Sequence, residues 1–375
     1  MNKNKKLNVM YKGRIVGSMC LVKNYLCAFE YSDEWLTNGF SISPYSLPLR
    51  KQVFIPKLDP LDGLFGVFAD SLPDGWGRLL VDRMLLKNGV NPRTIANLDR
   101  LAIVGNSGMG ALTYEPEVAL PSTQSGLDLD KLAQECSKIL QSESTTDLDT
   151  LFYLGGSSGG ARPKILTPID GEEWIIKFPA SSDDKNIGKQ EYDYSQCAKA
   201  CGIEMSETRL FPSQICSGYF GTKRFDRIKT AHGTERVHMI TASGLLETSH
   251  RIPNLDYDIL MKLTLNLTKS FGEVEKLYRL MCFNVYAHNR DDHSKNFTFV
   301  YNDEESRWQL SPAYDLTYSY SIGGEHATTI HGNGTNPSLD DLLAVAKNIG
   351  MEESPALRIA KTTEEYVHEY LKEYL

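Results

Sequence analysis

The sequence has no long apolar run. It contains no stretch of the roughly 18 uncharged apolar residues that a membrane-spanning helix needs. The basic N-terminus, MNKNKKLNV, is not followed by the apolar core of about seven residues that secretion signals carry. The sequence therefore indicates neither membrane insertion nor secretion, and a cytoplasmic protein is expected.

The cysteines form no metal-binding pattern. There are seven, an odd number, without any C-x-x-C pair. Cys197 and Cys201 lie one helical turn apart, but no histidine is near them in the sequence. Reduced thiols and the absence of zinc are expected. His326 and His331 are too widely spaced for a zinc motif and are expected on a surface loop or a phosphate-proximal loop.

The chain also lacks an excess of positive charge. Its formal net charge is -8 at pH 7. Because non-specific binding of nucleic acids depends on neutralising phosphates, any contact with DNA is expected to be local or supplied by a partner. No internal repeat, low-complexity tract or helix-turn-helix pattern stands out.

The length and patterning indicate several packed subdomains. A chain of 375 residues with 41% hydrophobic residues can bury more than one core. The clearest composition break, at residues 116–130, contains PSTQSG and predicts a hinge. Short strands joined by a Lys12-Gly13 turn are expected within residues 7–31. Helices are expected at residues 76–86, 129–140 and 274–286 and in the segments that follow residue 338.

The segment NRDDHSKN, residues 289–296, has the residue types of a phosphoryl-transfer site. Such a site needs a carboxylate that accepts the hydroxyl proton, and an amide and a second carboxylate that bind magnesium. Asp291, Asn296 and Asp315 supply these groups in that order, and the five-residue step from Asp291 to Asn296 matches the protein-kinase catalytic loop. The alternative is a turn whose side chains bond their own backbone.

A glycine-rich segment, LGGSSGGARPK at residues 154–164, lies between a segment predicted as a strand, 151–154, and a β-compatible segment, 165–167. Glycines let main-chain amides approach a polyphosphate closely, and Lys164 adds positive charge. The segment is not a P-loop, because Arg162 and Pro163 intervene and no Ser or Thr follows Lys164. A flexible linker is the alternative, but the apolar strand WIIKFP follows directly.

Lys177 lies in the middle of that apolar strand, between Ile176 and Phe178. An outward position on an edge strand is the ordinary explanation for a lysine there. The functional interpretation makes Lys177 the residue that binds the α- and β-phosphates, with Glu191 on the following helix as its ionic partner. The order of glycine-rich turn, strand lysine and helix glutamate favours the functional interpretation.

Together these segments resemble the HipA family of bacterial toxin-type serine/threonine kinases, over nearly the whole chain. The matching segments are VMYKGRIVGSM, FEYSDEWL, SPYSLPL, FADSLPDGWGR, IVGNSGMGALTYEP, SSGGARPK, WIIKFP, the helix at 190–200 with GIEM, GYFGTKRFDR, NRDDHSKNF and AYDL. The resemblance implies an α+β, protein-kinase-like two-lobed fold. A partly β accessory subdomain is expected at 1–120, a kinase N-lobe with the glycine-rich loop and the strand lysine at 145–235, and a mainly helical C-lobe with the catalytic loop at 236–375.

The resemblance also implies residue roles. Asp291 would be the proton acceptor, Asn296 and Asp315 the magnesium ligands, and Lys177 the phosphate-binding lysine. The nucleotide-binding residues implied are Gly159, Gly160, Ala161, Arg162, Pro163, Lys164, Lys177, Lys223, Arg224, Phe225, His293, Asn296 and Tyr314. Residues 223–225 would form the hinge, with Phe225 against the adenine. Ser157 aligns with the autophosphorylated serine of the family.

Two positions depart from the family pattern. The family loop commonly has D-G-H-x-K-N, whereas Asp292 replaces the glycine here. Either the two adjacent carboxylates repel one another and raise one pKa, or Asp292 points to solvent without effect. In the hinge, Lys223-Arg224 places a cation where the best-known member has an acid, although main-chain contacts would survive that change.

The resemblance thus implies an ATP- and Mg2+-dependent serine/threonine protein kinase, the toxin of a toxin-antitoxin pair, regulated by autophosphorylation. A protein substrate such as an aminoacyl-tRNA synthetase is expected, with a separate DNA-binding antitoxin of HipB type and contact with DNA only through that complex. The N-terminal subdomain, which carries none of these site residues, is expected to dock the antitoxin. The alternatives are a kinase-fold phosphotransferase for small molecules and a catalytically silent corepressor module that binds the antitoxin.

Overall fold

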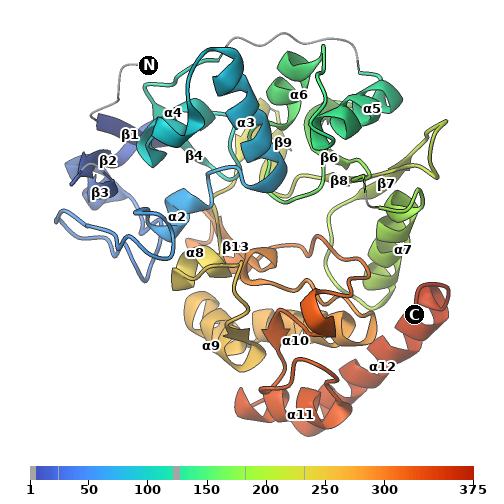
Figure 1. The fold of residues 1–375 in the computed structure, drawn as a ribbon. Helices are drawn as coiled ribbons and strands as arrows, with labels where there is room; N and C mark the ends of the chain where they lie inside the picture. The colour runs from blue at the N-terminus through green and yellow to red at the C-terminus, as the bar shows by residue number, and fades with distance from the viewer. Residues whose placement is uncertain (1–5, 24, 121–126, 182, 232) are drawn as a thin grey trace. The chain divides into compact units, whose positions relative to one another are not determined.

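The computed structural model describes residues 6–23, 25–120, 127–181, 183–231 and 233–375 (Figure 1). The chain forms two compact units. The first comprises residues 1–185, 211–240 and 244–248, and the second comprises 186–210, 241–243 and 249–375. Among the described helices, none has the length and apolarity to cross a bilayer.

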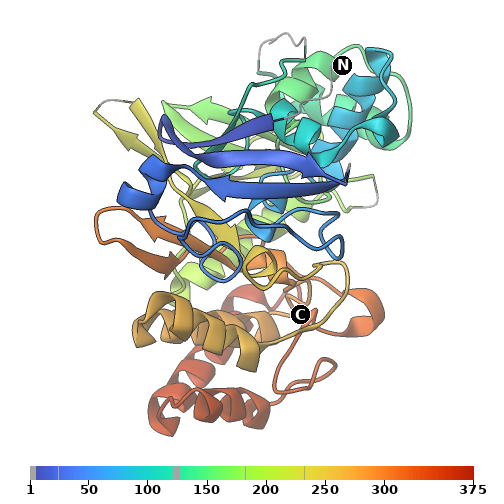
Figure 2. The ribbon, with the colours of Figure 1, turned by 90° about the vertical axis from the view of Figure 1, so that its left-hand side faces the viewer.

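The first unit begins with an antiparallel sheet in the order β3-β2-β1-β4, whose first three strands lie side by side in Figure 2. A turn at Lys12 and Gly13, both with positive φ, joins β1 to β2 and confirms the predicted hairpin. Buried side chains such as Val9, Met19 and Phe29 form its core face. The strands are β1 (Lys6–Tyr11), β2 (Arg14–Val22), β3 (Leu26–Tyr31) and β4 (Leu112–Glu115).

Helices of the first unit pack on one another and on a second sheet. The predicted helices at 76–86 and 129–140 are confirmed as α3 and α5, and α3 lies beside α6 (Figure 1). The predicted strand at 151–154 is wrong, because it lies within α6. A short apolar run does not by itself distinguish helix from strand, and here Leu151 and Leu154 are buried three residues apart while Tyr153 is exposed. The helices are α1 (Asp33–Asn38), α2 (Gly66–Ala69), α3 (Gly75–Lys87), η1 (Pro92–Thr94), α4 (Asn97–Val104), α5 (Leu129–Leu140) and α6 (Leu148–Gly155).

The second sheet of this unit carries the strand with Lys177. β6 pairs with β5 on one side and β8 on the other, so the alternative explanation of Lys177, an edge strand, does not hold. A shared core of Trp76, Leu80, Leu151, Ile165 and Ile176 joins α3 and α6 to the sheet. The strands are β5 (Lys164–Ile169), β6 (Glu172–Lys177), β8 (Tyr219–Lys223), β9 (Arg227–Thr230) and β10 (Gly233–Arg236). The chain crosses between the units along β7 (Thr208–Phe211) and β11 (Met239–Thr241), and α8 (Ala242–Leu246) follows.

The second unit is mainly helical. α10 lies between α9 and α12 (Figure 1) and buries the predicted stripe of Val274, Leu277, Met281 and Val285. It begins at Phe271, three residues before the predicted start, and ends three residues before Asn289. Its helices are α7 (Ile187–Ala200), α9 (Tyr257–Thr268), α10 (Phe271–Tyr286), η2 (Ser294–Asn296), η3 (Ile322–Gly324), α11 (Leu339–Asn348) and α12 (Glu353–Leu371). Its short strands are β12 (Leu255–Asp256), β13 (Thr298–Asn302), β14 (Arg307–Leu310) and β15 (Thr328–Thr329).

Candidate functional site

The glycine-rich loop spans the eight residues between α6 and β5. Gly160 has φ 82°, and a Cβ there would lie 2.5 Å from Lys164 Nζ. The positive φ favours glycine at this position, whereas the Lys164 side chain is flexible and could move aside. Gly160 and Ala161 are exposed, Gly159 and Arg162 are half-buried, and Pro163 is buried at the start of β5. Gly160 and Ala161 thus form the exposed tip of the loop.

Residues from the N-terminal part of the chain support this loop. The Asp74 carboxylate accepts a hydrogen bond from Gly160 N, and Trp76 N donates to Gly160 O at 2.9 Å. The Trp76 indole donates to Lys164 O at 3.1 Å. A Cβ at Gly77 would lie 2.2 Å from Ser158 O, so only glycine permits this approach. Sequence reasoning missed these supports, although they lie in the matching segment FADSLPDGWGR.

Two lysines face each other beside the loop. Lys164 pairs directly with Lys177 across β5 and β6, which places both side chains on the same face of the sheet. Lys164 Nζ donates to Gly159 O at 2.6 Å, and Lys177 Nζ lies 5.6 Å from the centre of the Phe220 ring. Like charges directly opposite one another destabilise a β-ladder. Two positive charges on one face beside the loop would attract an anion such as a polyphosphate.

The two serines of the loop differ in accessibility. Ser158 is 1% exposed and donates to Gly155 O at 2.6 Å. Ser157 is half-buried. Beyond the glycines, the Arg162 guanidinium bonds the Asp183 carboxylate at 3.0 Å. Of the two hydroxyls, that of Ser157 is therefore the one open to modification, while the Arg162 side chain is engaged by a carboxylate.

The hinge segment begins where β8 ends. Lys223 Nζ lies 2.5 Å from a Glu172 carboxylate oxygen. Arg224 N donates to Glu173 O at 2.8 Å, which extends the strand pairing. Phe225 is half-buried. With the Lys223 side chain held by a carboxylate, the hinge can offer the Phe225 ring and its main chain to a ligand.

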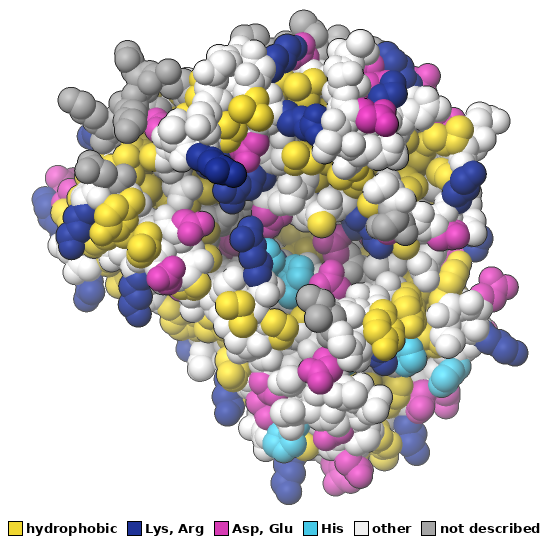
Figure 3. All heavy atoms as spheres, viewed as in Figure 1, with side chains coloured by type: hydrophobic (Ala, Val, Ile, Leu, Met, Phe, Trp, Pro, Cys, Tyr) yellow, Lys and Arg dark blue, Asp and Glu magenta, His cyan; other side chains and the backbone are white. Residues whose placement is uncertain are grey.

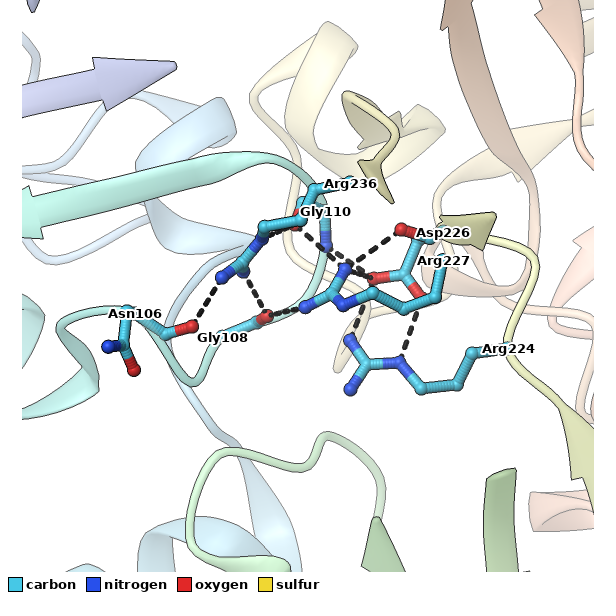
Figure 4. Close-up of polar contacts among 7 residues, drawn as sticks. All are labelled: Asn106, Gly108, Gly110, Arg224, Asp226, Arg227 and Arg236. Atoms are coloured by element: carbon cyan, nitrogen blue, oxygen red, sulfur yellow. Dashed lines mark hydrogen bonds and ion pairs between the residues drawn. The ribbon is translucent and has the colours of Figure 1, made fainter. Parts of the chain in front are cut away.

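A buried charge cluster fixes the end of the hinge (Figure 4). Asp226, which is fully buried, accepts two hydrogen bonds from Arg224, at 2.9 and 2.8 Å, and one each from Arg227 and Gly110 N, both at 2.7 Å. Burial favours the neutral carboxyl group, but Arg224 and Arg227 prevail and hold the pKa of Asp226 well below its usual range. Burial lowers the pKa of Arg227 to about 9 and that of Arg236 to about 10. Arg227 and Arg236 also donate to the carbonyl groups of Asn106, Gly108 and Gly110.

The loop at residues 289–296, in the second unit, brings three of the predicted site residues together. The Asp291 side chain is 64% exposed, and His293 Nε2 lies 4.0 Å from its carboxylate. Asn296 Nδ2 donates to Asp291 O at 2.7 Å. This bond uses the amide nitrogen and leaves the amide oxygen of Asn296 as a possible metal ligand. The spacing of five residues is what allows Asn296 to reach back to Asp291.

The residue before Asp315, Tyr314, forms hydrogen bonds with this loop and with the strand that follows it. The Tyr314 hydroxyl donates to Lys295 O at 2.6 Å and lies 2.5 Å from Thr298 Oγ1. Asp315 itself has φ 54°, a left-handed conformation that costs free energy in any residue except glycine. Such strain persists only where the surrounding contacts impose it. The contacts of Tyr314 therefore help to fix where the Asp315 carboxylate lies.

Several buried polar atoms near this loop are unsatisfied. Within the residues that the structure describes, hydrogen-bond partners are lacking for Asn289 Oδ1, Arg290 Nε, His293 Nδ1, Ser294 Oγ and Thr317 Oγ1. Buried polar atoms are normally satisfied, so a concentration of unsatisfied ones around a loop fits a ligand-binding site. The described residues contain no group of three or more His, Cys, Asp or Glu side chains that could hold a metal. The pair Asn296 and Asp315 suits magnesium, which commonly takes one or two protein ligands and completes its shell with phosphates and water.

The expectation that Asp292 points to solvent is wrong. It is fully buried, next to the exposed Asp291, and its carboxylate accepts hydrogen bonds from Tyr257, His326 and Thr328 N. His326 is 3% exposed, so the expectation that it lies on a surface is wrong. These contacts join parts of the sequence separated by more than thirty residues, which local patterns do not reveal.

The predicted partner of Lys177 lies in the other unit. Glu191 is buried on α7, with 3% of its surface exposed. Lys177 ends β6 in the first unit. Their ion pair, like the roles assigned to the other site residues and the three-part domain division, stays a prediction.

Known proteins support the fold and the family. Solved HipA from Shewanella oneidensis MR-1, in a toxin-antitoxin complex with HipB and its operator DNA, matches with a TM-score of 0.72 at 18% identity, over 98% of this chain and 90% of that one. The predicted kinase-like α+β fold is confirmed. Two Sinorhizobium fredii proteins are similar: "Putative kinase Y4mE", 28% identical over 83% of this chain and 76% of its own, and "Putative kinase Y4dM", 26% identical over 80% and 74%. The HipA N-terminal domain matches residues 7–115 and the HipA-like C-terminal domain matches residues 156–370. The chain therefore belongs to the HipA family.

Proposed function

We propose that this chain is an ATP-dependent serine/threonine protein kinase that acts as the toxin of a toxin-antitoxin pair. The observation that carries the proposal is the pairing of Lys164 with Lys177 beside the glycine-rich loop. It is supported by the joint placement of Asp291 and Asn296 on one loop of the second unit. Membership of the HipA family and two relatives named as kinases agree with this chemistry.

Each group has a defined task in this proposal. The glycine-rich loop, with the two lysines, binds the phosphates, and Phe225 packs against the adenine. Asp291, exposed to solvent, accepts the proton of the substrate hydroxyl group. A magnesium ion held by Asn296 and Asp315 would neutralise the charge that develops on the phosphates. Asn296 is oriented for this by the bond from its amide nitrogen to Asp291 O.

Autophosphorylation at Ser157 is proposed as the regulation of this site. A phosphate there would add a charge of about -1.5 to -2 to the loop that must receive the phosphates of ATP. The repulsion would displace the loop and stop turnover. The burial of Ser158 and its bond to Gly155 O favour Ser157 as the modified residue.

The proposed partners are a protein substrate and a separate antitoxin of HipB type, with DNA bound only through that complex. On the face shown in Figure 3, basic and acidic side chains are interspersed, and the net charge is -8. Such a surface gives little non-specific affinity for DNA. An aminoacyl-tRNA synthetase is the substrate to test first, on the strength of the family resemblance, and the proposed compartment is the cytoplasm.

The test is transfer of labelled phosphate from ATP to the proteins of a cell lysate with magnesium, comparing wild type with Asp291→Asn. Asparagine keeps the shape but cannot accept the proton, so we expect a loss of more than about 100-fold. Nucleotide binding should remain. Label confined to small molecules would support the small-molecule phosphotransferase instead. Transfer that Asp291→Asn leaves unchanged would refute the assignment.

A further inference from the structure

The residue that follows the proposed base, Asp292, has a buried carboxylate that accepts several hydrogen bonds. Asp292 Oδ2 accepts hydrogen bonds from the Tyr257 hydroxyl and His326 Nδ1, both at 3.0 Å, and Oδ1 accepts one from Thr328 N at 3.1 Å. Asp292 O also accepts a bond from Thr328 Oγ1 at 2.5 Å. A carboxylate satisfied by three donors in a dry interior is held in one orientation.

A ring of side chains leads from Asp292 back to the start of the same loop. The Tyr257 hydroxyl accepts from Asn284 Nδ2 at 2.9 Å, and Asn284 Oδ1 accepts from Asn289 Nδ2 at 2.9 Å. An ionised carboxylate only accepts, so the Tyr257 hydrogen points at Asp292 and its oxygen is left to accept from Asn284. Burial, and then the charge of Asp292, raise the pKa of Tyr257 well above its ordinary value and keep this donor protonated.

Asp291 lies between the two loop residues that belong to this ring. Asn289 and Asp292 flank the pair Arg290 and Asp291. Asn289 is bonded to Asn284 of α10. Asp292 is bonded to Tyr257 at the start of α9. Asn289 N also donates to Asn284 O at 2.9 Å. The main chain that carries Asp291 is therefore pinned on both sides by buried groups.

A second set of bonds joins this loop to the segment that follows Asp315. Ala327 N donates to Arg290 O at 3.0 Å, next to the contacts of His326 and Thr328 with Asp292. The 326–329 segment is in turn paired with β12, where Thr328 lies opposite Leu255. Hydrogen bonds therefore connect the loop and this segment to each other and to the residues at the start of α9.

We propose that Asp292 is a positioning residue, which acts through Asp291 by holding the main chain of the catalytic loop against α9, α10 and the 326–329 segment. The inference rests on the proposed function for its catalytic consequence. A glycine, which the family loop commonly has at this place, has no side chain that could accept these bonds. This chain therefore fixes the base by buried side-chain contacts that such a loop cannot make.

The test compares Asp292→Asn, Asp292→Ala, Tyr257→Phe and Thr328→Val with wild type in the full chain. Tyr257→Phe and Thr328→Val keep the side-chain volume and each remove one hydroxyl donor to Asp292, so they carry the test if the alanine variant does not fold. The matched control is Asp258→Asn, which removes the negative charge from a second Asp–His contact of 2.9 Å, with His331, two residues beyond the 326–329 segment. That pair is partly exposed, and no bond from it to the catalytic loop is seen in the described residues.

Two readouts separate positioning from mere stability. The turnover number should fall by roughly 10- to 100-fold in Asp292→Ala, as expected for a small displacement of a reacting group, while the KM for ATP stays within about twofold. Asp292→Asn, which retains one acceptor oxygen, should lose less. Amide hydrogen exchange of residues 289–293, measured without nucleotide, should quicken in Asp292→Ala and Tyr257→Phe but not in Asp258→Asn.

The outcomes distinguish this inference from the proposed function. If wild type transfers no phosphate, the proposed function fails, and the exchange of residues 289–293 still decides whether Asp292 orders the loop. If wild type is active and Asp292→Ala or Tyr257→Phe retains both its turnover and its slow exchange, the positioning role is overturned. An equal loss of turnover in Asp258→Asn overturns it too, because that change leaves the ring intact.

Discussion

Replacing Asp226 by asparagine tests whether the buried charge cluster holds the first unit together. The Asp226 side chain is 0% exposed, and those of Arg224 and Arg227 are 4% and 9% exposed. Asparagine removes the charge, and its NH2 group would face donors on Arg224, Arg227 or Gly110 N. Removing one partner of a buried ion pair costs about 3–5 kcal/mol, because the remaining charges stay buried without compensation.

This cost corresponds to a large change in melting temperature. For a unit of roughly 200 residues, each kcal/mol shifts the midpoint by about 2–4 °C, so the expected fall is about 6–20 °C. The depressed pKa of Asp226 means that its stabilisation is present above the unfolded pKa of about 4 and is lost as the pH falls toward the folded value. The wild-type protein should therefore exceed Asp226→Asn in free energy of unfolding by the whole of this amount at pH 7. The excess should decrease only at acidic pH.

Calorimetry and urea unfolding at pH 7 measure this effect. Glu235→Gln is the matched control, because Glu235 pairs with Lys12 at 3.2 Å while both side chains are exposed, at 54% and 36%. Exposed ion pairs contribute about 0–1 kcal/mol to the free energy of unfolding, so the melting temperature of the control should remain close to that of wild type. If Asp226→Asn unfolded at the same temperature as Glu235→Gln, the cluster would not be a stabilising element and the reasoning would be refuted.

Three further predictions concern the proposed activity. MgATP at about 100 times its dissociation constant should add about 2.7 kcal/mol to the free energy of unfolding, and Asp315→Ala should lose the magnesium-dependent part; an unchanged melting curve at millimolar MgATP would count against nucleotide binding. Mass spectrometry should find phosphate on Ser157, not Ser158, in wild type and none in Asp291→Asn; equal phosphate in both proteins would exclude autophosphorylation. The antitoxin should inhibit without competing with ATP, and the purified chain should bind DNA weakly; nanomolar binding with a steep salt dependence would contradict a role for the partner in reading DNA.

Local patterns predicted the parts of the structure that depend on neighbouring residues. The apolar spacing of Val274, Leu277 and Met281 predicted α10, and the five-residue step from Asp291 to Asn296 predicted that both lie on one loop. In both cases the residues that determine the structure are close together in the sequence. The helix predicted at 129–140 succeeded for the same reason, with Leu132, Cys136 and Ile139 buried on one face.

Long-range contacts could not be predicted in this way. The bond between Gly110 N and Asp226 joins residues 116 positions apart, and that between Asp74 and Gly160 joins residues 86 apart. No periodicity in either segment specifies its partner. The burial of Asp292 has the same origin, since a carboxylate in a polar loop is ordinarily solvated, and donors from the distant Tyr257, His326 and Thr328 compensate for its burial.

The support of the glycine-rich loop by Asp74 and Trp76 limits how this chain can be divided. Trp76 and Leu80 of α3 pack in the same core as Ile165 of β5 and Ile176 of β6. A protein that began at residue 145 would expose this apolar surface and would lose the indole donor to Lys164 O. The region that matches the HipA N-terminal domain is thus a structural component of the proposed nucleotide site, so truncation before the loop would remove catalytic competence together with any docking surface.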